Sequence, residues 1–566
     1  MPSSVALDTK GTSSWEASAQ RAKSPARLFA LTRALLVAIL LVAPLPFGAV
    51  QEWAWGTLSV LAFLLLLLWS LNNLQQGVIR LVWSPLYVPA GLFFLLGMAQ
   101  FFGHLTMDPI ATRESLLKLA ADLILFFMAM QFFGAPAPAR STRVPAGEGG
   151  GALRRVGEGV GGPSASPLGW TIVVYSFLLA LFAIFQFFSS HGLIYWTVKT
   201  PGWTFGPYVN HNHYAGLMEM LIPIMVASVL TAFRRPPALP PSHAESSEAS
   251  GPISGLRWSP SVRLLGSDGV QWTPWIGDSR NRRQVPRSLP AGLAGPAYGQ
   301  AGASKAGRES STTALAVFLG CVVLIPVVSV LLSGSRGGLI SLAVEVLLAA
   351  VLIFLRGPAS ARKITAVLGS SALIAAALLF VWMAPRQSLE RLETVVDATH
   401  SPEVGLADRL VASRDALGIL RDHPWLGAGL GSFETVFHRY QSFPSDLTWD
   451  HAHNDYAEAL AETGAAGGAL ILFALGWFFW LAFGNLRERL RHRAGWIQFG
   501  AALGCCGLLV HSFVDFNLHI PANAAWFAVC VALATNEERF FNSVTPGDIR
   551  ANKPQAGRGK SAIPSC

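Results

Sequence analysis

The chain has 566 residues, of which 52% are hydrophobic and only 13% charged, and its mean hydropathy is +0.43. Soluble domains carry about 25% charged residues, so this composition excludes an ordinary soluble protein and indicates a polytopic membrane protein. The formal net charge of +9 would also suit a nucleic-acid-binding protein, but the positions of the basic residues decide between that and membrane topology. The five cysteines lie in apolar runs or at the C-terminus, so they indicate no disulfide framework.

Twelve apolar runs approach the length of about 20 residues that crosses a bilayer. They predict an all-α fold with about twelve transmembrane helices, at 28–44, 54–71, 86–102, 115–133, 169–188, 214–233, 312–332, 337–355, 364–383, 464–483, 496–512 and 520–536. The first run is followed by no small-residue cleavage site, so we expect it to remain as the first span.

The apolar runs divide the chain into segments. We expect a cytoplasmic tail at 1–27, helices 1–6 over 28–233 with a flexible cytoplasmic loop at 134–167, a disordered cytoplasmic linker at 234–311, helices 7–9 over 312–383, a periplasmic catalytic loop at 384–463, helices 10–12 over 464–536, and a cytoplasmic tail at 537–566. Arginine and lysine are concentrated in the segments assigned to the cytoplasm, as the positive-inside rule requires. The basic charge is therefore better explained by topology than by nucleic acid.

The loop at 384–463 contains one clear helical pattern. Residues 408–420 have apolar positions at Leu410, Ala416, Leu417 and Leu420, which predict an amphipathic helix that ends before Pro424. The glycine-rich stretch 427–431 predicts a turn. We expect these pieces to form a small helical lid without a hydrophobic core of its own.

The loop ends in the densest group of titratable residues in the chain, at 450–458. His451 and His453 are two residues apart, so they can act on one ligand only if the next helix begins after them. We expect that helix to begin at Asn454 and to end with a C-terminal cap at Gly464, with Glu458 and Glu462 on one face.

Three interpretations of the two histidines remain open. They can be solvated turn residues, or metal ligands, since His-x-His-x-Asp also opens a metallo-hydrolase pattern that continues with histidine where Tyr456 stands here. The third interpretation is a general base, because an imidazole titrates near neutral pH and can take a proton from a hydroxyl. Asp450 or Asp455 would orient such a base.

Arginines near the same membrane face are candidates for binding an anion. Arg336 lies between two apolar runs, where an arginine is costly unless it snorkels to head groups or grips a phosphate with its planar fork. Arg409 can be a second phosphate clamp or a solvated loop residue. Further candidates for substrate contact on this face are Asn210, His211, His213, Arg414 and Asn454. His511, Asp515 and His519 bracket another turn, and we interpret Asp515 as structural.

The order of these motifs resembles the O-antigen ligase and Wzy polymerase superfamily of bacterial envelope glycosyltransferases. The residues that carry the resemblance are Ser333–Gly338, Arg409, Asp422–Phe433, His451–Tyr456 and Glu462–Gly467, with weaker matches at Asn212–Gly216 and Asp515–Asn517.

The resemblance implies a GT-C-type membrane fold in the bacterial inner membrane and a role in lipopolysaccharide or other polysaccharide biosynthesis. It implies transfer of a glycan from undecaprenyl diphosphate to an acceptor hydroxyl at the periplasmic face, without a metal or other cofactor. By matching motifs, His453 would be the general base, with His451 and Asp455 beside it, and Arg336 and Arg409 would bind the diphosphate. Lipid A core, a glycan chain and a protein hydroxyl all remain open as acceptors.

Two alternatives to a ligase remain. The same chemistry would serve a repeat-unit polymerase or a protein O-oligosaccharyltransferase. A transporter or flippase belongs to a different class and should show repeated halves and polar residues buried in the middle of its spans. The polar groups of this sequence instead gather on one face, which favours the enzyme.

Overall fold

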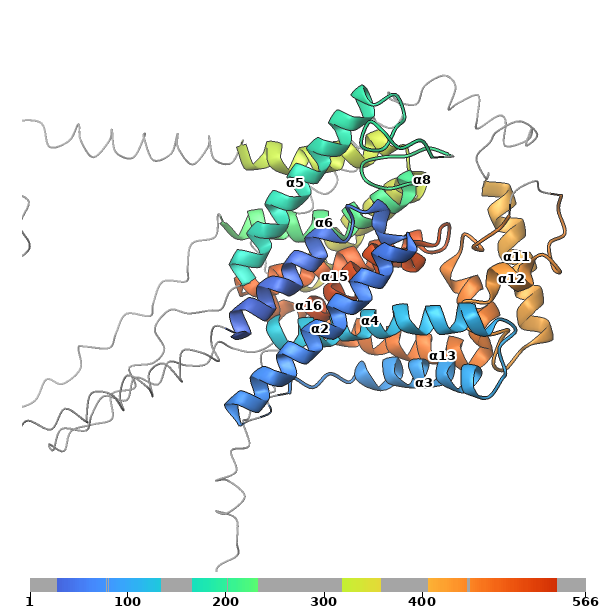
Figure 1. Cartoon of the computed structure of the whole chain (residues 1–566). Coiled ribbons are helices and arrows are strands. Elements are labelled where there is room, and N and C mark those ends of the chain that lie inside the picture. Colours follow the sequence, from blue (N-terminus) through green and yellow to red (C-terminus); the bar gives the residue numbers. More distant parts are fainter. Residues whose placement is uncertain are drawn as a thin grey trace, which may run out of the picture. The chain divides into compact units, whose positions relative to one another are not determined.

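The computed structural model describes residues 28–77, 79, 81–133, 165–200, 202–232, 318–357, 406–444 and 448–536. Within these ranges the chain is helical, with isolated β-bridges at residues 194 and 198 and at 205 and 208 but no strand (Figure 1). The prediction of an all-α polytopic membrane protein is therefore confirmed.

Seven of the described helices are long and apolar enough to cross a membrane. They are α2 (Glu52–Gln76), α4 (Pro109–Phe133), α5 (Ala165–Ser189), α6 (His211–Ala232), α8 (Arg336–Arg356), α13 (Asp455–Phe483) and α15 (Arg493–His511). Four shorter apolar helices are Leu28–Val42, α3 (Tyr87–Phe102), Phe318–Ser333 and α16 (Pro521–Thr535). These account for every predicted span except 364–383, which lies outside the described residues, as do the predicted tails and most of both predicted linkers.

The remaining described elements are short or lie in the polar loop. They are η1 (Phe47–Ala49), α11 (Leu406–Asp422), α12 (Phe433–Phe437), α14 (Leu486–Arg489) and η2 (Asn517–His519).

Helices α6 and α15 form the centre of the bundle. Their most apolar windows are 89% and 78% buried, against 22% for α8 and for α13. Close approach of the two backbones explains this burial, since a methyl group at Gly500 or Gly504 would lie 2.5–2.6 Å from the carbonyl oxygens of Pro223 and Met220. The exposed apolar faces of α8 and α13 are those expected of helices that contact lipid.

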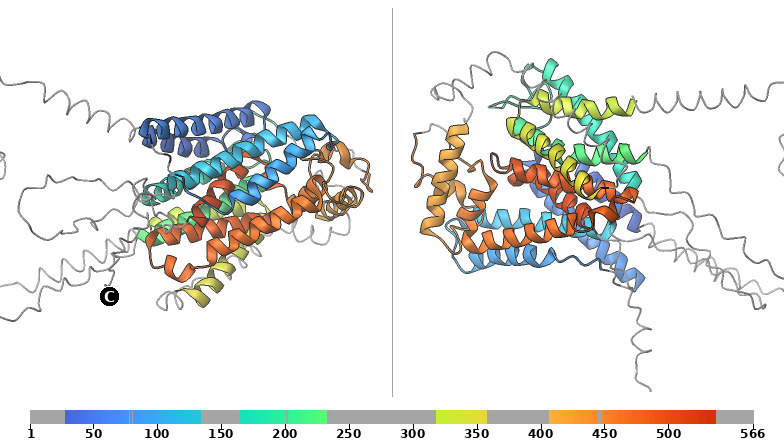
Figure 2. Two further views of the ribbon diagram at one scale, coloured as in Figure 1. Left: turned by 90° about the horizontal axis from the view of Figure 1, so that it is seen from below. Right: turned by 180° about the vertical axis from the view of Figure 1, so that it is seen from behind.

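Helix α13 packs beside α3, which in turn packs beside α4 (Figures 1 and 2), and α13 contains a sharp break at Gly464. Gly464 has φ 63° and ψ −163°, a conformation open almost only to glycine. The glycine-rich turn satisfies the backbone groups that this break releases, because Ala428 N–H donates to the carbonyl of Ala461 at 2.9 Å and Gly429 N–H donates to that of Glu462 at 3.0 Å. In return, Ala465 N–H donates to the carbonyl of Pro424, also within the loop, at 2.8 Å.

These bonds confirm the turn at 427–431, where three glycines have positive φ. They also correct the predicted helix end. Gly464 does adopt the left-handed half of the backbone map, but the helix resumes after it and continues to Phe483. The last nine residues assigned to the polar loop therefore form the first part of a membrane helix.

The Gly464→Ala substitution should destabilise the protein. Its Cβ would lie 2.5 Å from the carbonyl carbon of Trp425, and its backbone conformation alone costs of order 1–3 kcal/mol for a non-glycine residue. We expect a lower midpoint of thermal unfolding in detergent. Gly476→Ala is the matched control, because it lies in the same helix with open space around it and should be neutral or stabilising. Equal midpoints for the two variants would contradict this account of the break.

The polar loop has a hydrophobic core of its own, contrary to the prediction. The core comprises Ala412, Ala416, Ile419, Ala428, Phe433, Val436, Phe437, Trp449, Ala452, Ala457 and Ala461. Helix α11 was predicted correctly. Of its predicted apolar positions, Ala416 is buried in this core, whereas Leu410 and Leu417 are 59% and 45% exposed. Small side chains at Ala412 and Ala416 let α11 pack closely on α13, and this close packing decides which face is buried.

Candidate active site

A cavity of about 510 Å³ lies where the polar loop meets α4, α6 and the segment between α15 and α16. Five imidazoles line it, from His211, His213, His451, His453 and His519. Lys118 and Arg409 also line it, and Asp450 is the single carboxylate in the lining. The cavity is therefore suited to an anionic ligand.

Asp515 brings the basic residues of the cavity together from below. Its side chain is fully buried in the segment that follows α15. Its Oδ1 lies 3.4 Å from Nδ1 of His453 and 3.7 Å from Nε2 of His213, and its Oδ2 lies 3.3 Å from Nη1 of Arg409. Three segments far apart in the sequence thus converge on one carboxylate.

The charges around Asp515 keep it ionised. Burial alone would raise the pKa of its carboxyl group, but the facing rings of His213 and His453 and the guanidinium of Arg409 lower that pKa well below its usual value. Arg409 is also fixed by donating from Nη1 to the carbonyl oxygen of Val514 at 2.7 Å. The carboxylate therefore acts as a permanent anchor for the groups above it.

Several nitrogen atoms around this anchor have unused hydrogen-bonding capacity. Nε of Arg409, Nδ1 of His453 and Nε2 of His213 are buried and form no hydrogen bond in the described structure. His453 also has a positive φ of 49°, which is uncommon for a residue other than glycine. A proton on its Nδ1 would point toward Asp515, and Nε2 would then be the basic nitrogen.

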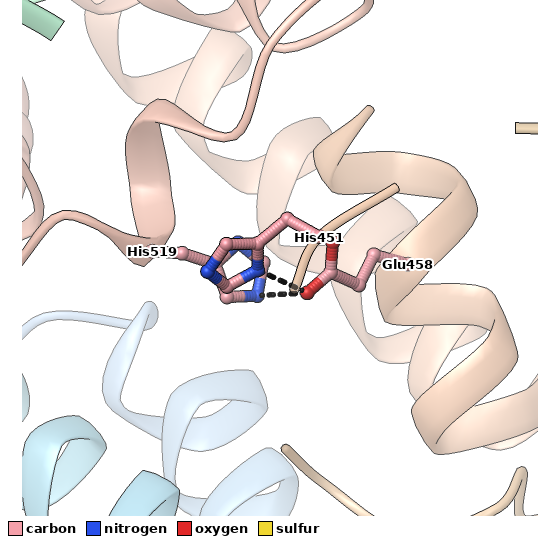
Figure 3. A group of neighbouring side chains, drawn as sticks. All are labelled: His451, Glu458 and His519. Carbon is pink, nitrogen blue, oxygen red and sulfur yellow. Dashed lines mark hydrogen bonds and ion pairs between the residues drawn. The ribbon is translucent and has the colours of Figure 1, made fainter. Parts of the chain in front are cut away.

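A second cluster lies on the cavity wall, where His451 and His519 converge on Glu458 (Figure 3). Nδ1 of His451 lies 2.7 Å, and Nε2 of His519 lies 3.3 Å, from the same oxygen of Glu458. Nδ1 of His519 lies 2.8 Å from Asp455, while Ala452 N–H donates to the other oxygen of Glu458 at 2.8 Å. Asp455 therefore contacts His519, and Asp515 is the carboxylate that faces His453.

The two carboxylates stabilise the charged form of His519. Burial alone would lower the pKa of His519, but Glu458 and Asp455 raise it to about 10. Because this folded-state pKa is above the unfolded value of about 6.5, the stability it contributes is fully present below pH 6.5 and is lost as the pH rises through 10.

His519→Gln should therefore lower the unfolding midpoint most below pH 6.5 and progressively less toward pH 10. Thermal unfolding of wild type and variant at pH 6, 8 and 10 measures this difference. His438→Gln, at an exposed position, serves as the control and should show no such trend. A difference for His519→Gln that does not change with pH would contradict the charged pair.

His451, Glu458 and His519 are also the one group in the described residues with the spacing of metal ligands. Their ligand atoms lie within 4.8 Å of one another. Asp455 would hold His519 in the tautomer that presents Nε2 to an ion, as second-shell carboxylates do. In the structure itself, direct contacts among the three side chains satisfy the same atoms.

The other candidate residues lie in different surroundings. Asn210 and His211 line the cavity, and Asn210 also accepts from the backbone N–H of Asn212 at 2.9 Å. Asn454 caps α13 by accepting from the N–H groups of Tyr456 and Ala457 at 3.0 and 3.1 Å. Arg414 is exposed on α11 and does not line the cavity.

Arg336 is exposed at the first residue of α8 and is also absent from the cavity lining. Its neighbours nevertheless lie near the wall. A methyl group at Gly334 would be 3.6 Å from the ring of Trp203, which lines the cavity, and one at Gly337 would be 3.1 Å from Val514, which accepts from Arg409. The start of α8 therefore borders the Asp515 cluster.

Sequence reasoning missed the central position of Asp515, which it treated as structural, and the pairing of Glu458 with two histidines. One signal was available: His511, Asp515 and His519 recur every four residues around a turn that is otherwise largely apolar. Ionisable groups at regular spacing beside membrane spans are costly unless they meet partners. The partners, however, come from α6, α11, α13 and the segment before α13, and their proximity follows only from the fold.

Part of the chain matches a known protein family. Residues 321–472 match the family model described as O-antigen ligase, a stretch that contains Arg336, Arg409, His451 and His453 but neither His213 nor Asp515. No curated protein matches the chain. The matched residues and the helical membrane fold support the predicted relationship to the O-antigen ligase and Wzy polymerase superfamily.

Proposed function

We propose that this protein transfers a glycan from undecaprenyl diphosphate to an acceptor hydroxyl at the periplasmic face of the bacterial inner membrane. His453 is the general base, and Arg409 and Arg336 bind the diphosphate. The observation that carries the proposal is the convergence of His453 and Arg409 on Asp515 at the wall of one cavity.

The reaction needs a base and a positively charged leaving-group site. The acceptor hydroxyl gives its proton to Nε2 of His453 while its oxygen bonds to the anomeric carbon of the glycan. The bond between that carbon and the phosphate oxygen breaks, and the electron pair leaves with the diphosphate. Asp515 supports the imidazolium that forms, because its carboxylate faces Nδ1 of the same ring at 3.4 Å.

The basic lining of the cavity supports the diphosphate assignment. The unpaired Nε of Arg409 is a buried donor that a phosphate oxygen would satisfy. Lys118 lines the cavity from α4, and its ammonium lies 5.0 Å from the ring centroid of Trp55. These cations would offset the charge that develops on the leaving group.

The proposal gives the two histidines of the cluster different roles. His453 reaches the acceptor. His451 is instead held by Glu458 at 2.7 Å, and its ring stacks on Phe516 with centroids 4.2 Å apart. His451 therefore positions the cavity wall. In this proposal the step requires no metal, since the glycan is already activated by its diphosphate.

The test is transfer by the purified full chain in lipid nanodiscs. Undecaprenyl-diphosphate-linked glycan is supplied with a lipid A core, a glycan chain or a protein as acceptor, and released undecaprenyl diphosphate is measured with and without a chelator. We expect release with one of these acceptors, unchanged by chelation. Release that stops on chelation and returns with a divalent ion would instead make His451, Glu458 and His519 a metal centre. Movement of the intact lipid-linked glycan across a bilayer without release would indicate a flippase.

A further inference from the structure

A seam of buried polar side chains runs between α6, α8 and α15, below the cavity. Its members are His511, Glu219, Ser341 and Glu345, and each is at most 3% exposed. Glu219 is the ninth residue of α6 and Glu345 the tenth of α8, so each lies about 12–14 Å along its helix at a rise of about 1.5 Å per residue. Polar groups therefore also occur deep within the spans, contrary to the expectation that they gather on one face.

Glycines allow this seam to close. A methyl group at Gly338 would lie 3.1 Å from Oε1 of Glu219, and one at Gly507 would collide with Oε1 of Glu345. Gly338, Ser341 and Glu345 follow one another on the buried face of α8. The sequence thus provides space for two carboxyl groups where three helices meet.

One of the two carboxyl groups has a basic partner. Oε1 of Glu219 lies 2.8 Å from Nδ1 of His511, and both side chains are fully buried. The other oxygen of Glu219, Oε1 of Glu345, the hydroxyl of Ser341 and Nε2 of His511 form no hydrogen bond within the described ranges. The hydroxyl and the imidazole nitrogen can each donate at most one hydrogen bond, fewer than the two carboxyl groups can accept.

The described helices around Glu345 place no positive charge beside it. Glu219 faces it from α6, and the thiols of Cys505 and Cys506 face it from α15. His511 is already paired with Glu219. A carboxylate buried at this depth without a counter-charge is strongly destabilised, so the arrangement favours a Glu345 whose negative charge is neutralised by a bound cation or proton.

We propose that Glu345, with Ser341 and Glu219, is an intramembrane proton-binding site and holds one proton at neutral pH. A proton suffices because a single O–H supplies the missing donor to a neighbouring acceptor oxygen. Among the described helices around the seam, Pro223 of α6 removes the helical donor to the carbonyl of Glu219. Such free carbonyls can help to bind sodium, so sodium is the alternative occupant that the experiment must exclude. The upper end of the seam, at His511, abuts Gly337 next to the diphosphate candidate Arg336.

Infrared difference spectroscopy of the purified full chain in nanodiscs tests the site at pH 7. The spectrum of wild type minus that of Glu345→Gln should contain the carbonyl stretch of one protonated carboxyl group, shifted in D2O. Glutamine has nearly the volume and the neutrality of the protonated acid, so the variant should fold. Glu488→Gln is the matched control, because Glu488 is about half exposed and paired with Arg491 at 2.8 Å, and its difference spectrum should contain only carboxylate bands.

Carboxylate bands alone in the Glu345 difference would overturn the proposal. So would a protonated band that is present in choline chloride and replaced by carboxylate bands in sodium chloride, since the occupant would then be sodium. If Glu345→Gln does not fold, modification of wild type by dicyclohexylcarbodiimide, which reacts with protonated carboxyl groups, should map to Glu345. None of these readouts requires glycan transfer, so the proton site and the proposed function can fail independently.

Discussion

His453→Ala should lower glycan transfer by about 10²–10⁴-fold, the usual contribution of a general base. The loss follows from the position of the ring, which lines the cavity and faces Asp515 at 3.4 Å. Transfer rates of purified protein in nanodiscs measure it. The amount of folded protein should change little, because His453 forms no hydrogen bond through Nδ1 that the fold depends on.

The matched control is His438→Ala, since His438 is exposed beside α12 and does not line the cavity. It should retain full transfer. Wild-type activity in His453→Ala would remove the general-base role. Loss of activity in both variants to the same degree would indicate a general effect on the polar loop.

Arg409→Lys should lower transfer by about 10–100-fold, the kinetic equivalent of losing charge-assisted hydrogen bonds worth about 1.5–3 kcal/mol. Lysine keeps the positive charge that Asp515 needs, so the buried carboxylate remains paired. Lysine lacks the planar guanidinium group of Arg409. In that group Nη1 donates to both Val514 and Asp515, while Nε stays free to donate to a phosphate. The Michaelis constant for the lipid-linked donor and the turnover rate should be measured separately.

Arg421→Lys is the control for this substitution, because Arg421 is exposed on the same helix and away from the cavity lining. Arg336→Lys should also lose transfer, but less than Arg409→Lys, since Arg336 lies outside the lining. Full activity in Arg409→Lys would show that charge alone is enough at this position.

Much of the fold could be predicted because apolar length is a local property of the sequence. The runs that predicted α5 and α8 are helices within a few residues of the expected bounds. The start of α13 at Asn454 was also predicted, but its continuation past Gly464 was not, because it depends on the turn at 424–429 bonding to the break. Such a contact joins distant residues and leaves no local pattern.

In the candidate site, too, local sequence predicted some features, and contacts between distant residues decided the others. His451 and His453 attracted attention because titratable residues cluster there, and both line the cavity. The sequence could not reveal that Asp515 lies below His453 while Asp455 turns to His519. Both carboxylates can be noticed in the sequence. Which of them faces His453 depends on how the α15–α16 connection packs beneath the polar loop.

The break in α13 has a consequence for how the protein is assembled in the membrane. The amide and carbonyl groups released at Gly464 have partners in the loop at 424–429, and groups left without partners in lipid cost several kcal/mol each. The helix beyond the break therefore reaches its final hydrogen bonding only when the preceding polar segment has folded against it. Folding of that segment and completion of the helix should thus be coupled, so that a delay in one holds back the other.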